Sequence, residues 1–277
     1  MQTSYSPLVF VRLLFGGIFN SIGWFFLVIG LIFTYVFDIP GTIDGFVNFQ
    51  GELAEAKGVI TGTSATNFSE NNQVVYEVKF KFRDSNRETL ENYSFSLDPP
   101  AEGDEVIIEY NPANPYYSRV QGLRFSQAPI WISFILIFPL IGLIFVLINM
   151  AKGAATIGLI RKGLLTNGVL KSKSKTAMRV NNQPVYKLTF EFQARDGRRY
   201  TCDAKTHLPA NLEDEERERI LYNPDNPGKA VLVDSLPLNL KSEGGTYIFS
   251  SKGGYILIVL NLILPVAALI ILYNMFS

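Results

Sequence analysis

Three long stretches of the chain carry no charged residue, and they separate regions of different character. They cover residues 13–37, 128–150 and 253–277, and each exceeds 20 residues. At about 1.5 Å of rise per residue, a helix of that length spans a hydrocarbon core roughly 30 Å thick. A buried helix of a water-soluble core normally has a polar face at helical spacing, which these stretches lack. The pattern predicts three transmembrane helices, at residues 8–37, 128–150 and 253–276.

Between these stretches the pattern changes to period two. One face of each predicted strand is apolar: Val74, Tyr76, Val78, Phe80 and Phe82 in the first region, and Tyr186, Leu188, Phe190 and Phe192 in the second. Such alternation is typical of a half-buried β-strand. Turn residues follow at 84–86 and 196–197, so each strand is expected to open a hairpin.

The two regions are copies of one module. At an offset of 110 residues, NNQVVYEVKFKF from Asn71 matches NNQPVYKLTFEF from Asn181. Several short strands in each copy predict a small antiparallel barrel of the OB or SH3-like kind, module 1 at residues 51–122 and module 2 at residues 166–235. The predicted fold class is an α + β membrane protein, in which three transmembrane helices alternate with two small antiparallel β-barrel-like domains.

Each module closes with the motif Tyr-Asn-Pro-x-Asn-Pro. Its residues are Tyr110, Asn111, Pro112, Asn114 and Pro115 in module 1, and Tyr222, Asn223, Pro224, Asn226 and Pro227 in module 2. Proline has no N–H for a ladder and pushes the preceding residue to an extended conformation. The motif is therefore predicted to end a strand and to turn the chain through a corner to the last strand. The alternative, a Pro-rich recognition site, would need a longer exposed polyproline stretch.

The charges of the two regions differ in sign, although the net charge of the chain is zero. Residues 38–127 hold 7 Lys and Arg against 14 Asp and Glu, whereas residues 151–252 hold 17 against 11. Because basic segments are retained in the cytoplasm, the N-terminus and module 2 are predicted to be cytoplasmic and module 1 periplasmic or extracellular. Residues 151–165 are expected to form an amphipathic helix at the membrane interface.

Two alternatives to this topology arise from the same residues. If residues 128–165 formed a re-entrant hairpin, both modules would share one face, although the apolar stretch is too short for two full crossings. The first stretch also resembles a secretory signal, but it is longer than the roughly 7 to 15 residues of a signal core and no Ala-x-Ala-like site follows it.

The order of transmembrane helix, small β module and closing motif resembles the bacterial family called domain of unknown function 3592. The residues that carry the resemblance are the Gly-Val pairs at Gly58 and Gly168 and the two Tyr-Asn-Pro-x-Asn-Pro motifs. The resemblance covers residues 51–122 and 163–235, so the module would be present twice. It implies a prokaryotic envelope protein with small β domains tethered beside the membrane, and it brings no catalytic residues. Members with one module between two helices differ from this chain.

Candidate residues for catalysis are few. His207 is the single histidine and Cys202 the single cysteine, and the sequence contains no P-loop, dinucleotide fingerprint or Cys-x-x-Cys. A Cys202–His207 pair is the one arrangement open to nucleophilic catalysis. The acidic residues within 211–220 lie beside Arg217 and Arg219, and such mixed signs are more typical of a solvated segment than of a cation site. We therefore expect no catalytic, cofactor or metal site, and no enzyme.

Basic residues near the second span indicate contact with anionic lipid. They are Lys171, Lys173, Lys175, Arg161 and Lys162, and alternation would place the first three on one strand face. A charged strand edge that prevents aggregation is the alternative for the three lysines. No aromatic residues interleave them, so nucleic acid is not expected as a partner. Within the third span, Asn261 is the candidate for a hydrogen bond between helices.

These features favour a non-enzymatic protein of the bacterial inner membrane whose duplicated β modules mediate protein interaction or envelope scaffolding. The expected partners are the lipid bilayer, a membrane or envelope protein, and a second copy of the chain. The alternative function is that of an accessory subunit in a membrane transporter or protease complex.

Overall fold

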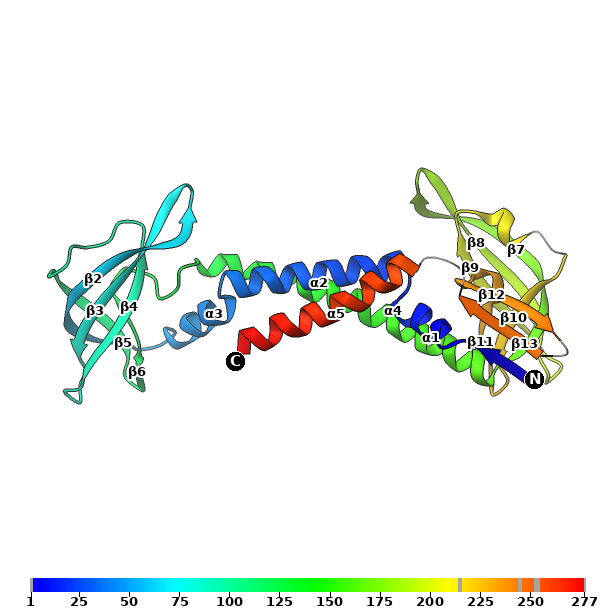
Figure 1. Ribbon diagram of the computed structural model, residues 1–277, viewed down its shortest axis with the longest axis horizontal. Helices are drawn as coiled ribbons and strands as arrows, with labels where there is room; N and C mark the ends of the chain where they lie inside the picture. Colours follow the sequence, from blue (N-terminus) through cyan, green and yellow to red (C-terminus); the bar gives the residue numbers. More distant parts are fainter. Residues whose placement is uncertain (1, 214–215, 244–245, 252–254, 277) are drawn as a thin grey trace. The chain divides into compact units, whose positions relative to one another are not determined.

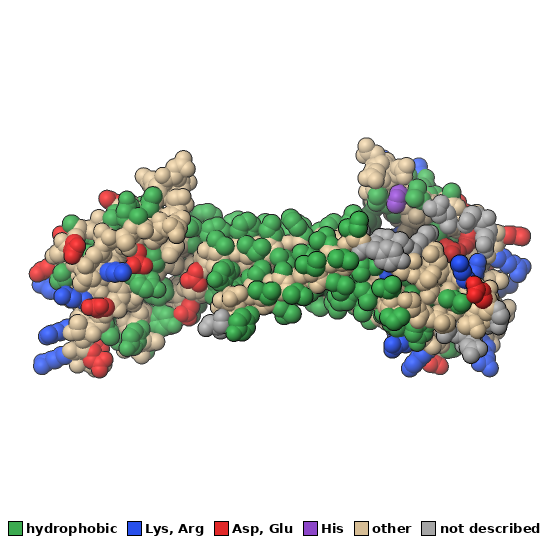
Figure 2. All heavy atoms as spheres, in the orientation of Figure 1, with side chains coloured by type: hydrophobic (Ala, Val, Ile, Leu, Met, Phe, Trp, Pro, Cys, Tyr) green, Lys and Arg blue, Asp and Glu red, His purple; other side chains and the backbone are tan. Residues whose placement is uncertain are grey.

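The computed structural model describes residues 2–213, 216–243, 246–251 and 255–276. The chain forms two compact units, residues 1–25 with 141–267 and residues 26–140 with 268–277. Three helical segments are long and apolar enough to cross a membrane: Ile18–Val36, Ile130–Lys162 and Ile258–Met275. Hydrophobic side chains cover their visible face (Figure 2). The three predicted apolar helices are therefore present, with the length and composition that a membrane span requires.

The first predicted helix, residues 8–37, is divided in two. Helix α1 covers Pro7–Phe15 and α2 covers Ile18–Val36. The N–H of Gly16 donates to the carbonyl of Arg12 at 2.9 Å and closes α1, and Gly17 follows with a φ of 95°. Glycine adopts this φ at no steric cost, so the Gly-Gly pair separates the two helices. The prediction of one continuous helix was wrong at this point.

The second span runs further than predicted. A 3₁₀ helix, η1, covers Ile130–Leu136, and α4 follows it directly and covers Ile137–Lys162. The predicted division between residues 150 and 151 is absent, because one helix passes through it. Pro139 lies in the first turn of α4, where a missing N–H removes no intrahelical hydrogen bond. The third span, α5, covers Tyr255–Phe276.

Module 1 is a five-stranded antiparallel sheet in the order β4-β3-β2-β5-β6. Its strands are β2 Ala54–Glu70, β3 Gln73–Arg83, β4 Thr89–Ser96, β5 Glu105–Asn111 and β6 Asn114–Val120. The edge strands β4 and β6 approach each other, since the N–H of Val120 donates to Ser94 Oγ at 2.9 Å. A bridge between Phe95 and Arg124 extends this seam. The sheet is thereby nearly closed into a barrel (Figure 1). Helix α3, Ile39–Asn48, precedes it and was not predicted.

Module 2 repeats this topology in the order β11-β10-β7-β8-β9. Its strands are β7 Leu164–Val180, β8 Gln183–Gln193, β9 Arg199–Thr206, β10 Glu218–Asn223 and β11 Asn226–Leu232. Short 3₁₀ turns, η2 Pro209–Leu212 and η3 Val233–Ser235, flank the last hairpin. The predicted pair of small antiparallel barrel-like domains is confirmed.

Each long hairpin turns at two asparagines. Asn71 and Asn72 have φ values of 51° and 66°, and Asn181 and Asn182 have 49° and 61°. A type I′ turn needs positive φ at both central residues, and asparagine tolerates this conformation better than most side chains. The Asn-Asn pair is present in both copies of the repeat, but it was not predicted to form a turn.

The predicted apolar faces form the module cores, with one exception. Val78, Phe80 and Phe82 are buried as predicted, whereas Val74 is 40% exposed and its neighbour Val75 is fully buried. A register shift in β2 between residues 65 and 69 changes the pairing near the hairpin end. Strict alternation fails at this irregular end of the hairpin, and Val75 is buried in place of Val74.

A second sheet in the same unit as module 2 was not predicted. It has the order β1-β13-β12, with β1 Gln2–Tyr5, β12 Leu238–Glu243 and β13 Thr246–Ser251, and β1 runs parallel to β13. Phe249 and Leu238 from this sheet share a core with Val9 of α1 and Ile160 of α4. The N-terminal strand thus joins residues from the far end of the sequence.

Candidate functional site

The tyrosine of each Tyr-Asn-Pro motif locks the neighbouring hairpin turn. Tyr110 and Tyr222 are each 3% exposed, and each ring packs on a core phenylalanine with centroids 5.4 Å apart. The hydroxyl of Tyr110 accepts the N–H of Ser85 at 3.2 Å, and that of Tyr222 accepts the N–H of Arg195 at 3.0 Å. The same bond at the same place in both modules indicates a folding role for the tyrosine.

Tyr222→Phe is expected to lower the free energy of unfolding of module 2 by about 1 kcal/mol, because the partly buried N–H of Arg195 loses its acceptor. Amide hydrogen exchange of the detergent-purified protein should show faster exchange in the turn at residues 194–198. Tyr110→Phe is the control, since its hydroxyl serves the equivalent turn of module 1, and it should leave exchange at residues 194–198 unchanged. Equal effects of the two substitutions would contradict the proposed lock.

The asparagine and proline residues of the motif form a hairpin. The side chains of Asn111 and Asn223 accept the N–H of Ala113 and Asp225, each at 2.9 Å. Asn111 also pairs with Asn114 across the turn, so the second Asn-Pro already lies in the last strand. The predicted end of a strand, the turn to the last strand and the asparagine bonds to backbone are present. The turn is a tight two-residue hairpin rather than a wider corner.

The long hairpins leave one strand edge of each module without a strand neighbour. In module 1, β2 pairs with β5 only up to Val59, and Ile60 bonds with the backbone at 103–104. Within the described part of the chain, residues 61–70 of β2 then pair with β3 alone. Residues 171–180 of β7 likewise pair with β8 alone. We call these segments the module 1 edge and the module 2 edge; Figure 1 shows both hairpin ends extending beyond the flanking strands.

The lysines predicted to contact lipid lie on the module 2 edge and do not share one face. A register shift between Leu170 and Ser172 places Lys171 at a bulge. Lys171 pairs with Glu191 at 2.7 Å on the outer face of β8. Lys173 lies over the ring of Tyr186, which packs on the module core, and pairs with Glu213 at 2.8 Å. Two of the three lysines therefore have acidic partners within the protein, and the predicted common face was wrong.

The other predicted lipid contacts are in the last turn of α4. Arg161 and Lys162 are both exposed, and the Arg161 guanidinium lies 4.9 Å from the ring centroid of Phe10 in α1. Lys175 is also exposed. Contact of these side chains with lipid remains a prediction.

Cys202 and His207 do not form a catalytic pair in this arrangement. Cys202 is 2% exposed inside the core of module 2, and burial, with Asp203 beside it, raises the pKa of its thiol from 9.0 to about 11. A thiol with this pKa is protonated at neutral pH and is a poor nucleophile. His207 follows the end of β9 and lines a surface groove described next.

Helices and module 2 together enclose a groove of about 550 Å³, which we call the module 2 groove. Its apolar wall contains Phe19 of α2, Phe145 and Ile148 of α4, and Met178 and Val185 from the β7–β8 hairpin. Its polar lining comprises Asn149, Lys152, Lys205, Thr206 and His207. All of these residues belong to one compact unit. The groove was not predicted, because its walls come from segments far apart in the chain.

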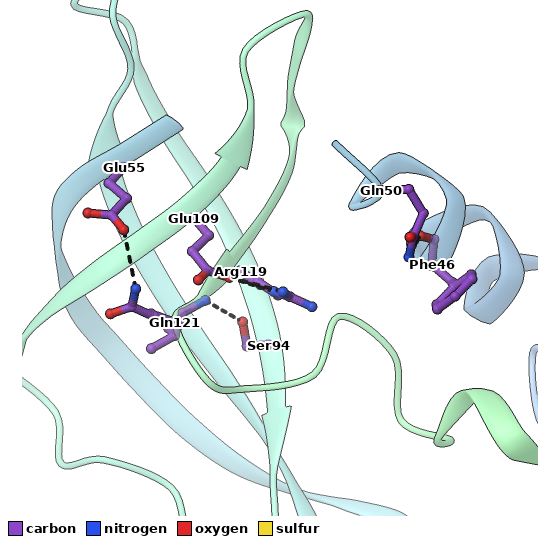
Figure 3. Close-up of polar contacts among 8 residues, drawn as sticks. Phe46, Gln50, Glu55, Ser94, Glu109, Arg119 and Gln121 are labelled. Atoms are coloured by element: carbon purple, nitrogen blue, oxygen red, sulfur yellow. Dashed lines mark hydrogen bonds and ion pairs between the residues drawn. The ribbon is translucent and has the colours of Figure 1, made fainter. Parts of the chain in front are cut away.

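A groove of about 330 Å³ lies between α3 and module 1, and we call it the module 1 groove. Arg119 extends from β6 toward α3 (Figure 3), pairs with Glu109 at 3.0 Å and lies 4.5 Å from the ring centroid of Phe49. The second arginine of the lining, Arg124, pairs with Glu70 at 2.8 Å. Both cations are therefore already neutralised by carboxylates of the same unit.

Asn261 and the acidic segment 211–220 are the remaining candidates, and their described side chains contact other parts of the protein. The Asn261 side chain is fully buried and donates to the carbonyl of Phe15 at the end of α1. In the acidic segment 211–220, Glu213 pairs with Lys173, and Asp214 and Glu215 lie outside the described residues. Among the residues that the structure describes, no three His, Cys, Asp or Glu side chains are grouped as a metal site would require.

No protein-family model matches the chain, and no curated protein matches it. A chain in the solved structure of a replication protein A heterotrimer bound to ssDNA is similar over 62% of this chain, with 10% identity and a TM-score of 0.18. The match spans 44% of that chain's length. A likeness at this TM-score supports no conclusion about fold or function. The resemblance to the domain of unknown function 3592 family therefore stays a prediction.

Proposed function

We propose that the chain is a non-enzymatic protein of the bacterial inner membrane, and that its β modules mediate interactions with other envelope proteins. The observation that carries the proposal is the module 1 edge. An unpaired strand edge offers N–H and C=O groups to an extended peptide, which can add to the sheet as a further strand. Residues 61–69 contain no charged side chain, so no charge on this edge opposes such pairing.

The matching edge of module 2 supports this assignment by contrast. Thr61, Thr63 and Ala65 of module 1 occupy the positions that lysines occupy in module 2, at the offset of 110 residues. Both edges carry a bulge at the first of these positions. Lysine on an edge strand discourages pairing with another strand. We assign partner binding to module 1 and infer that the lysines keep the module 2 edge free.

The non-enzymatic part of the proposal is supported by the hydrogen bonds of the polar residues that the two modules have in common. The motif tyrosines and asparagines bond to backbone within their own modules. The one thiol is buried and protonated at neutral pH. These groups serve folding, which leaves the strand edges and the surface grooves for binding.

Swapping the side chains at the three matched positions of the two edges tests the proposal. A photocrosslinking amino acid at exposed Ser64 should capture a defined partner in intact cells. The triple substitution Thr61→Lys, Thr63→Lys and Ala65→Lys should reduce the crosslinked product by about tenfold or more, because edge lysines oppose strand addition. The reverse exchange, Lys171→Thr, Lys173→Thr and Lys175→Ala, is the matched control and should leave the product unchanged.

The identity of the product separates the candidate partners. A product of twice the protomer mass would make the partner a second copy of the chain, and one stoichiometric foreign protein would favour an accessory subunit of a transporter or protease complex. No loss of crosslinking in the module 1 variant, with native proteolytic resistance retained, would refute edge pairing. Equal loss in both variants would do the same.

We further propose that the N-terminus and module 2 are cytoplasmic and module 1 periplasmic or extracellular. The charge difference between the two modules supports this orientation. Because Cys202 is buried, a cysteine introduced at exposed Ser172 is the better reporter of the face on which module 2 lies.

A further inference from the structure

The module 2 groove combines an apolar wall with two lysines that form no ion pair among the described residues. Lys152 and Lys205 are both exposed, and among the described residues neither belongs to an ion pair. Among the described residues that line the groove there is no Asp or Glu. Asp203, two residues from Lys205, pairs with Lys187 at 2.8 Å and interacts with Lys205 through its charge alone. The groove therefore retains a net positive charge, in contrast to the module 1 groove with its paired arginines.

The apolar wall is continuous with helices that are apolar enough to cross a membrane. Phe19 of α2 is 64% exposed and Ile148 of α4 is 50% exposed. Met178, near the end of the β7–β8 hairpin, is 51% exposed and faces the same groove. Large apolar side chains exposed beside cations fit a ligand that is apolar at one end and anionic at the other.

One polar atom in the lining lacks a partner. Asn149 Nδ2 is buried, and no hydrogen-bond acceptor lies within reach of it among the described residues. A buried donor without an acceptor is costly, and a ligand oxygen would satisfy it. The volume of about 550 Å³ lies within the range of small-molecule sites.

We propose that the module 2 groove binds one anionic glycerophospholipid, with the phosphate beside Lys152 and Lys205 and an acyl chain along Phe19 and Ile148. The ammonium groups supply charge-assisted hydrogen bonds to phosphate oxygens. The helix side chains supply an apolar contact for the acyl chain, which a free phosphate ion lacks. This inference rests on the proposed placement of the helices in a bilayer and does not depend on what the module 1 edge binds.

Native mass spectrometry of the full-length protein in a neutral detergent tests the site, with phosphatidylglycerol as the probe and phosphatidylcholine as the zwitterionic comparison. The double substitution Lys152→Gln and Lys205→Gln should weaken phosphatidylglycerol binding by about 30-fold, given the attraction of each basic residue for anionic lipid. Lys229→Gln with Lys241→Gln removes equal charge from exposed positions of the same compact unit outside the groove. This control should leave binding within about threefold of the unmodified protein.

A second pair of measurements separates a lipid from a free phosphate. Ile148→Ala should weaken phosphatidylglycerol binding several-fold and leave any binding of glycerol 3-phosphate unchanged. The proposal is overturned if glycerol 3-phosphate competes as strongly as the lipid, if phosphatidylcholine binds equally well, or if the control double substitution is as damaging as the groove substitution. Crosslinking from Ser64 should persist in the groove variants, so failure of this inference and failure of the proposed function are distinguishable.

Discussion

Phe190→Ala is expected to lower the free energy of unfolding of module 2 by about 3 to 5 kcal/mol. Phe190 is 1% exposed and packs in one cluster with Leu188, Phe192 and Ile220. Its removal deletes a large apolar side chain and leaves a cavity that the paired strands cannot close. Hydrogen exchange of the full-length protein in detergent should show loss of protection in peptides from β8, β9 and β10.

The duplicated module supplies the control. Phe80 is the equivalent residue of module 1 and is fully buried. Because the modules belong to different compact units, Phe80→Ala should release protection in β3 to β5 and spare module 2. If either substitution destabilised both modules equally, the independence of the two cores would be contradicted.

Gly30→Leu is expected to disrupt the packing of α2 against α4. A Cβ atom at Gly30 would lie 2.3 Å from Pro139 Cδ and 2.6 Å from Pro139 N, which is closer than non-bonded atoms approach. The helices must separate, because neither the proline ring nor its backbone nitrogen can move aside. Overpacking of this kind costs about 1 to 3 kcal/mol or more, so the melting temperature in detergent should fall by about 5 °C or more.

Gly158→Leu is the matched substitution for this test. Gly158 lies in α4, and no heavy atom lies within 4 Å of the Cβ position. The same change of residue should therefore leave the melting temperature unchanged or slightly raised, since leucine favours a helix more than glycine does. A similar fall for both variants would mean that the effect at Gly30 is not steric.

Much of the architecture could be predicted from local pattern. The uncharged stretches predicted the helices, the period-two alternation predicted β3 and β8, and the internal repeat predicted that both modules share one fold. Helix boundaries were less accurate, because the break at Gly16–Gly17 and the continuation of α4 through residue 150 depend on backbone conformation and neighbouring contacts.

The candidate sites were harder to predict. Alternation predicted a common face for the three lysines of the module 2 edge, but strict alternation fails at the bulge around Lys171. The module 2 groove draws on residues from 19 to 207, and a contact between segments so far apart has no signal in the local pattern. The β1–β13 pairing was missed for the same reason, since it joins the two ends of the chain.

Local sequence pattern is sufficient to predict three apolar helices, two related β modules and the difference in charge between the modules. These properties follow from the composition and periodicity of short segments, because each segment's own pattern sets which of its faces is apolar and becomes buried. Which polar groups bond to partners within the fold, and which stay exposed, depends on the tertiary structure. Tyr110 and Tyr222 proved to be turn locks and Lys171 and Lys173 proved to be paired, whereas Lys152 and Lys205 remained unpaired beside an apolar wall. Pairing and exposure depend on distances across the fold, and residue order alone does not set those distances.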